Sequence, residues 1–121
     1  MKVLVTGSRE WTNEEIIRRE LSLFPIGTII VHGACVWGAD SIADRVAREL
    51  GFEVREYEAR WGSYSRGFAG HARNDRMIRE EHRTEEPIDL CLAFPTFLCR
   101  GTWDCLWRAE QARIPTKVVT E

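Results

Sequence analysis

The sequence predicts a single α/β domain built on a parallel β-sheet, and three observations support this fold class. Short apolar runs alternate with amphipathic stretches along all 121 residues. The apolar runs have the length of strands, whereas the stretches between them carry apolar residues at helical spacing. No long linker, internal repeat or low-complexity segment interrupts the pattern. Strand–helix alternation implies right-handed crossovers and helices on both faces of the sheet, so we expect residues 1–121 to form one three-layer domain.

The first two expected elements are a strand over Lys2–Thr6 and the helix that follows it. The strand is a run of Val and Leu bounded by polar residues. Thr12 and Glu15 form a capping box, which predicts that a helix opens there with Ile17 and Leu21 on its apolar face.

The next stretch predicts a strand over Thr28–His32, a helix over Ala39–Leu50 and a strand over Phe52–Tyr57. The helix carries apolar residues at intervals of three and four. Gly51 closes this helix, because glycine readily adopts the backbone conformation found just after a helix.

An irregular segment over residues 58–70, rich in Gly, Ser and aromatic residues, precedes the last four elements. These are expected at Ala72–Arg83 (helix), Asp89–Phe94 (strand), Thr102–Arg113 (helix) and Thr116–Val119 (strand). Parallel sheets of this kind bind ligands outside the carboxyl ends of their strands. The loops after the first, second and fourth strands are therefore the candidate functional segments.

Composition and cysteine pattern exclude several classes of protein. Seventeen Lys and Arg against nineteen Asp and Glu give a net charge of −2, which disfavours non-specific nucleic-acid binding. No apolar run approaches the ~18 residues of a membrane-spanning helix, and the first strand begins too early for a signal peptide. The four cysteines form no CxxC pair, and no dinucleotide or P-loop fingerprint is present. We therefore expect a cytoplasmic protein with reduced thiols, no bound metal and no cofactor.

The loop after the first strand, Gly7-Ser8-Arg9, has the residue types of a phosphate-binding segment. Its glycine lets backbone approach a ligand closely, and an arginine can bind phosphate through two parallel hydrogen bonds. The alternative is a tight turn that carries a solvated arginine.

In the loop after the second strand, Gly33 and Gly38 bracket a segment that enters a helix, whose first N–H groups form a natural anion site. Asp40 lies in the first helical turn, a position that the helix dipole favours even without a ligand. Trp37 is expected either to stack on a base or to pack on a neighbouring loop. His32 has the alternatives of a structural histidine and a catalyst.

The loop after the fourth strand ends in Arg100, Gly101 and Thr102. The Thr102 hydroxyl is expected to cap the following helix, and the same hydroxyl and the adjacent amides could hold a phosphate. Arg73 and Asn74, at the start of the preceding helix, are also placed to meet a ligand.

These segments occur in one order along the chain. They are Gly7-Ser8-Arg9, the string from His32 to Asp40, Trp61, Ala69-Gly70 before Arg73-Asn74, and Arg100-Gly101-Thr102 with Asp104-Cys105. With these motifs the chain resembles the YspA, cpYpsA-related branch of the SLOG superfamily, which also holds the Lonely-Guy and DprA/SMF proteins. The resemblance implies a Rossmann-like fold of strand order 3-2-1-4-5 and a nucleotide-type ligand across the ends of strands one, two and four. Because such relatives commonly pair through helices, it also implies a homodimer, with Trp107 as a candidate contact.

The sequence departs from the Lonely-Guy pattern at the position of the catalytic glutamate. Cys105 occupies that position, and Asp104 precedes it by one residue. One residue on a helix is a rotation of about 100°, so Asp104 does not simply replace the glutamate. With no glutamate at this position, the candidate catalytic carboxylates of this chain are Asp40 and Asp104.

Three functions are compatible with these features. The first is the binding of a nucleotide or a nucleotide-derived molecule, for sensing or sequestration. The second is a phosphoribohydrolase that cleaves the N-glycosidic bond of a nucleoside monophosphate with Asp40, Asp104 or Glu58 as its carboxylate. The third is DprA-like handling of single-stranded DNA, which the negative charge disfavours but which Trp11, Trp37 and Trp61 could serve by stacking.

Overall fold

The computed structural model describes residues 1–60, 68–97 and 99–121, and over these residues the chain forms a five-stranded parallel sheet. The strand order is β3-β2-β1-β4-β5, which confirms the expected Rossmann-like topology. The strands are β1 (Lys2–Gly7), β2 (Ile29–His32), β3 (Glu53–Glu56), β4 (Leu90–Phe94) and β5 (Thr116–Val118). The central strand β1 pairs in parallel with β2 on one side and with β4 on the other.

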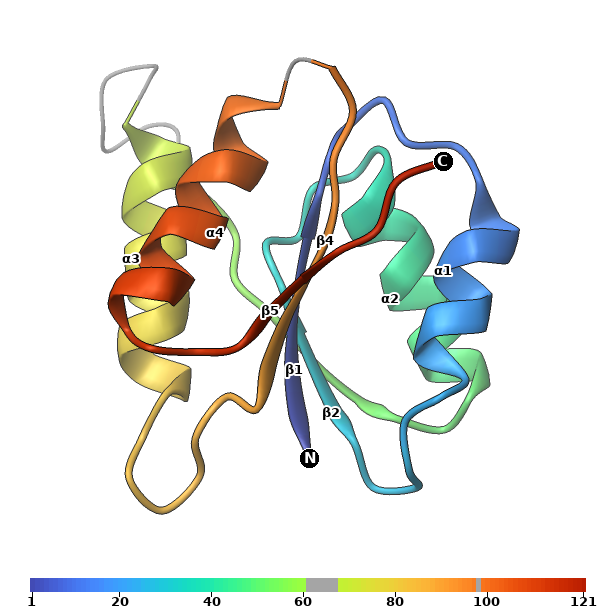
Figure 1. Cartoon of the computed structure of the whole chain (residues 1–121), viewed down its shortest axis with the longest axis horizontal. Helices are drawn as coiled ribbons and strands as arrows, with labels where there is room; N and C mark the ends of the chain where they lie inside the picture. Colours follow the sequence, from blue (N-terminus) through green and yellow to red (C-terminus); the bar gives the residue numbers. More distant parts are fainter. Residues whose placement is uncertain (61–67, 98) are drawn as a thin grey trace.

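Helices cover both faces of this sheet (Figure 1). They are α1 (Glu14–Leu21), α2 (Ala39–Glu49), α3 (Ala69–Glu81) and α4 (Arg100–Gln111). Helices α1 and α2 lie on one face and α3 and α4 on the other, as the two sides of Figure 1 show. The carboxyl ends of the strands lie toward the top of that view, opposite the N-terminus.

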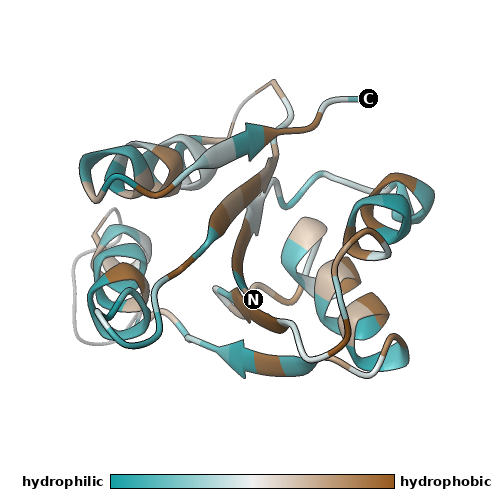
Figure 2. Ribbon diagram, turned by 60° about the horizontal axis from the view of Figure 1, so that its bottom comes forward, coloured by the Kyte–Doolittle hydropathy of each residue, from teal (hydrophilic) through white to brown (hydrophobic). Residues whose placement is uncertain are grey.

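The alternation of side chains along β1 divides the core between the two faces of the sheet. Val3 and Val5 pack with the residues of α1 and α2, whereas Leu4 packs on the opposite face with those of α3 and α4. All three side chains are completely buried. Figure 2 shows the result, with mainly hydrophobic central strands between helices that carry many hydrophilic residues. Cys91, in β4, also lies in this core.

The structure corrects three sequence-based assignments of helix starts. The cap of α1 is Asn13, whose side-chain oxygen accepts a hydrogen bond from the Ile16 amide, so the capping box predicted at Thr12 is wrong. Helix α3 begins at Ala69, three residues before the predicted start. The cap of α4 is Cys99, which places Thr102 inside the first helical turn.

Across the described part of the chain, no helix has both the length and the apolar character needed to cross a membrane.

Candidate functional site

A cavity of about 650 Å³ opens at the carboxyl edge of the sheet, between the loops that follow β1, β2 and β4. The predicted binding residues that line it are Gly7, Ser8, Arg9, Gly33, Trp37, Asp40, Arg73, Arg100, Gly101 and Thr102. Three other predicted residues, Gly38, Asn74 and Asp104, lie outside this lining. The structure therefore brings three loops that are far apart in the sequence to one concave surface.

Ser8 ties these loops together. Its amide donates a hydrogen bond to the Phe94 carbonyl at the end of β4 (3.0 Å). Its carbonyl accepts one from the Ala39 amide at the start of α2 (3.0 Å), and its hydroxyl oxygen accepts one from the Thr96 hydroxyl (2.6 Å). These three hydrogen bonds of Ser8 hold the loops after β1, β2 and β4 next to one another at the cavity.

Gly38 lies outside the cavity lining but sets its shape. Its φ of +73° is a conformation that other residues rarely adopt, and a Cβ atom there would lie 2.2 Å from the Ser8 carbonyl oxygen. Gly33 is constrained in a different way, since a Cβ atom there would lie 2.5 Å from Nη1 of Arg73.

Asp40 presents a buried carboxylate to the cavity, and its side chain is 94% buried, or 6% exposed. One oxygen, Oδ2, accepts a long hydrogen bond from the Cys35 amide (3.4 Å). The other, Oδ1, is buried with no hydrogen-bond partner among the described residues. Burial raises the pKa of Asp40, and this effect outweighs the lowering effects of His32, of Arg73 and of the Cys35 and Gly33 amides. Asp40 is therefore a desolvated acceptor that faces a space large enough for a ligand.

Arg73 reaches from α3 across the cavity to the loop after β2. Its Nη1 donates a hydrogen bond to the Gly33 carbonyl, and its Nε donates one to Oδ1 of Asn74 (2.9 Å). Arg73 therefore brings positive charge to the cavity wall from a fixed position.

Asn74 and Asp104 belong to a hydrogen-bond network between α3 and α4. The amide nitrogen of Asn74 donates to Oδ2 of Asp104 (3.0 Å) and to the Gly101 carbonyl (3.2 Å), and Asn74 is 2% exposed. Nε of Arg108 donates to the same Asp104 oxygen (2.9 Å). Both side chains are thus engaged in joining the two helices, and Asn74 acts on the cavity through Arg73.

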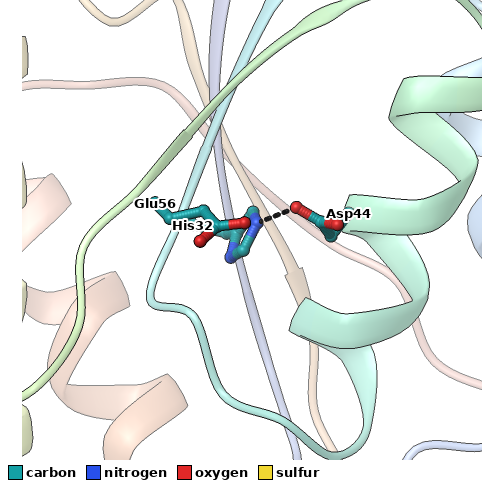
Figure 3. A group of neighbouring side chains, drawn as sticks. All are labelled: His32, Asp44 and Glu56. Carbon is teal, nitrogen blue, oxygen red and sulfur yellow. Dashed lines mark hydrogen bonds and ion pairs between the residues drawn. The ribbon is translucent and has the colours of Figure 1, made fainter.

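His32, Asp44 and Glu56 bring possible metal ligands within 4.8 Å of one another, and Figure 3 shows them together. The Ala34 amide donates to Nδ1 of His32 (2.9 Å), so the neutral ring carries its proton on Nε2 and donates it to Asp44 (2.9 Å). Arg48 donates to both oxygens of Asp44 and to Glu56. The Arg48 guanidinium thus already provides the positive charge beside these two carboxylates. Both ring nitrogens of His32 are engaged in hydrogen bonds that have a structural role.

Two of the three tryptophans considered for base stacking lie among the described residues, and they differ in exposure. Trp11 is 1% exposed and packs against Phe94 in the core, so its assignment as a stacking platform is wrong. Trp37 lines the cavity and is 69% exposed. Trp61 lies outside the described residues.

Several residues of the cavity wall were not singled out as ligand contacts from the sequence. They include Glu10, Cys35, Val36, Ala59, Gly70 and Cys99. Cys35 and Cys99 each lie within a predicted binding loop, which was the available signal. Ala59 lies in the irregular segment after β3, which carries no such pattern, whereas Gly70 lies at the start of α3 and belongs to the Ala69-Gly70 motif.

Two comparisons with known proteins show what this chain is similar to. The model of the YspA, cpYpsA-related SLOG family matches residues 1–64, which include the loops after β1 and β2. The chain is also 38% identical over 123 residues to the Gene 61 protein of Mycobacterium phage D29, covering 94% of this chain and 92% of that protein. Because the family model matches more than half of the chain, this chain belongs to the YspA, cpYpsA-related SLOG family.

Proposed function

We propose that this protein binds a nucleotide or a nucleotide-derived small molecule in the cavity at the carboxyl edge of the sheet, for sensing or sequestration. The observation that carries the proposal is the pairing of two kinds of group in one cavity. Arginines and a helix N-terminus suit a phosphate, and the unpartnered oxygen of Asp40 suits a hydroxyl donor.

The phosphate end of the ligand is assigned to the start of α4. Among the described residues, the amides of Arg100 and Gly101 have no hydrogen-bond acceptor, whereas the Thr102 amide donates to the Cys99 carbonyl. A Cβ atom at Gly101 would meet nothing within 4 Å, so a ligand can approach this backbone closely. The partial positive charge of the helix N-terminus adds to that of Arg9 and Arg100, which favours an anion here.

The sugar end is assigned to Asp40. A buried carboxylate oxygen without a donor destabilises the free protein, and a ligand that supplies a donor regains part of that energy. Sugar hydroxyls are such donors. A cavity of about 650 Å³ lies within the range of small-molecule sites and has room for a base as well.

A second candidate is hydrolysis of the N-glycosidic bond of a nucleoside monophosphate. The observation in its favour is that Asp40 and Glu58 both line the cavity. The raised pKa of Asp40 also suits a group that exchanges protons with a substrate. Asp104 does not line this cavity, so in such an enzyme Asp40 or Glu58 would act on the bond.

One experiment separates these candidates. The purified protein is mixed with ribonucleotides, the matching deoxyribonucleotides, nucleosides and inorganic phosphate, and the melting temperature and the released base are both measured. We expect ribonucleotides to raise the melting temperature most, nucleosides least, and no base to be released. Release of base that is lost in Asp40→Asn would support the enzyme instead. If no nucleotide alters the melting temperature, the binding proposal is wrong.

A further inference from the structure

A second, smaller cavity of about 160 Å³ lies beside α3. Among the described residues, its polar lining consists of four arginines and a single carboxylate: Arg60, Arg73, Arg76, Arg79 and Asp75. Three of the arginines follow one another on α3 at intervals of three residues, so they lie toward one side of that helix. The fourth, Arg60, joins them from the segment after β3. This α3 arginine pocket thus gathers four positive charges around one small space.

Most of the positive charge of the α3 arginine pocket is not neutralised by the protein. Arg60 and Arg76 form no ion pair with any residue that the structure describes. Arg55, by contrast, pairs with three carboxylates. Asp75 divides its two oxygens between Arg79 and an arginine of α4. Like charges held close together raise the free energy of the free protein, and a bound anion lowers it again.

Two guanidinium groups of the pocket are held in place by uncharged groups. Nη2 of Arg76 donates a hydrogen bond to the main-chain carbonyl of Glu58 (2.9 Å), and its guanidinium carbon lies 5.5 Å from the centre of the Tyr57 ring. Arg73 is likewise held by a main-chain carbonyl and a side-chain amide oxygen, as described above. These contacts orient the two groups without cancelling their charge. The other two arginines are exposed and can fold over an occupant.

The α3 arginine pocket lies next to the larger cavity at the sheet edge. Arg73 lines both spaces, and Ala59 and Gly70 of the larger cavity are followed or preceded in the chain by Arg60 and Ala69 of the pocket. The pocket is much smaller than the ~300–1,000 Å³ of ordinary small-molecule sites, and has room for about five water molecules at ~30 Å³ each. Its occupant is therefore a small anion or one charged group of a larger ligand.

We propose that the α3 arginine pocket is a second anion site, which binds a phosphate group. The paired N–H donors of arginine match the oxygens of a phosphate, and several arginines together offset its charge. The group can come from inorganic phosphate, or it can be a second phosphate on a ligand that lies in the larger cavity and reaches past Arg73. The first source does not depend on what the larger cavity binds, whereas the second rests on the function proposed above.

The test is an NMR titration of the isotope-labelled full chain, read at the Nε–H signals of the arginine side chains. We expect sodium phosphate to shift the signals of Arg60, Arg76 and Arg79 saturably. Sodium chloride at the same ionic strength should cause only small shifts that do not saturate, because it acts by screening. Arg60→Ala should weaken phosphate binding, followed at Arg76, by about tenfold or more.

Arg83→Ala is the matched control for Arg60→Ala, because each substitution removes one exposed arginine. Arg83 lies just after α3, lines neither cavity and donates only to the Glu80 carbonyl among the described residues. It should leave phosphate binding at the pocket unchanged. Circular dichroism confirms that each variant is folded.

Calorimetric titration with a nucleoside monophosphate and with the matching bisphosphate distinguishes the two sources of the phosphate group. If a second phosphate of the ligand reaches the pocket, the bisphosphate binds more tightly, and Arg60→Ala removes the gain. If free phosphate occupies the pocket, the monophosphate and inorganic phosphate bind together and the bisphosphate shows no gain. Shifts that do not saturate with phosphate, or that chloride reproduces, overturn the proposal. So do equal losses of phosphate binding in Arg60→Ala and Arg83→Ala.

Discussion

A Cβ atom on Gly38 would lie 2.2 Å from the carbonyl oxygen of Ser8, so the loop after β2 can cross the loop after β1 only with glycine at this position. The same Ser8 carbonyl accepts the hydrogen bond from the Ala39 amide that fixes the start of α2. Close packing of two backbones therefore holds two walls of the cavity in place.

Gly38→Ala should both destabilise the fold and impair binding. Its positive φ alone costs about 1–3 kcal/mol for a residue with a Cβ atom, and the clash with Ser8 adds to this. Gly51→Ala is the matched control, because its φ is +80° but a Cβ atom there meets nothing within 4 Å. Urea unfolding and calorimetric titration with a nucleotide measure the two effects. Equal losses of stability in the two variants would contradict the role of the Ser8 contact.

Asp40→Asn should stabilise the fold at neutral pH and weaken ligand binding. The pKa of Asp40 is raised by burial, so the folded state holds this proton more tightly than the unfolded state. The ionised carboxylate therefore lowers stability at neutral pH, and this penalty decreases as the pH falls through the raised pKa toward the ordinary value of about 4. The stability advantage of Asp40→Asn should shrink over the same range, as urea unfolding at a series of pH values will show. A constant difference between the two proteins would contradict the assignment.

The fold was predictable because the alternation of strand and helix patterns fixes a parallel sheet, and the strand order followed from the resemblance. The helix starts were less predictable. Thr12 with Glu15 is a good capping sequence, yet the cap is the neighbouring Asn13, whose side chain binds the Ile16 amide. Local capping signals at adjacent residues compete, and tertiary packing decides between them.

The loops of the site were predictable from glycines and polar residues at strand ends, but the partners within the site were not. Trp11 follows a binding loop in sequence and nevertheless packs on Phe94 in the core. Nδ2 of Asn74 donates a hydrogen bond to Oδ2 of Asp104 (3.0 Å), a contact between two helices that no local sequence pattern predicts. Such contacts depend on how α3 and α4 pack.

Asp104→Ala should reduce stability without changing nucleotide binding. The substitution removes the acceptor of the Asn74 amide and of the Arg108 guanidinium, and a loss of about 1–3 kcal/mol is expected for partly buried bonds of this kind. Asp75→Ala is the control, since Asp75 forms exposed ion pairs that contribute at most about 1 kcal/mol. Urea unfolding measures both.

Chromatography of AMP incubated with the wild type should show negligible free adenine, and turnover that Asp104→Ala abolishes would instead make Asp104 catalytic.

The four thiols should react in two classes. Cys91 and Cys105 are buried together, and the hydrogen bond between their side chains and their burial raise the pKa of Cys91. They should react with a thiol reagent only after unfolding, because the thiolate is the reactive form. Cys35 and Cys99 line the cavity and are partly exposed, so they should react in the folded protein. A bound nucleotide should slow their reaction, and an unchanged rate in the presence of a nucleotide that binds would place its site elsewhere.

Arg9→Ala tests the phosphate contact itself. Arg9 is exposed and lines the cavity, so its loss should leave the free energy of unfolding nearly unchanged. If Arg9 donates charge-assisted hydrogen bonds to a phosphate, nucleotide binding should weaken by about 1.5–3 kcal/mol, or roughly tenfold or more. Arg9→Lys should recover only part of the loss, because an ammonium group lacks the paired donors of a guanidinium.

Arg79→Ala is the matched control. Arg79 is an exposed arginine of α3 that pairs with Asp75 and lies outside the cavity lining. Calorimetric titration at low and high salt should show a loss specific to Arg9 that persists at high salt. Equal losses in both variants that vanish at high salt would replace the specific phosphate site with a diffuse basic surface.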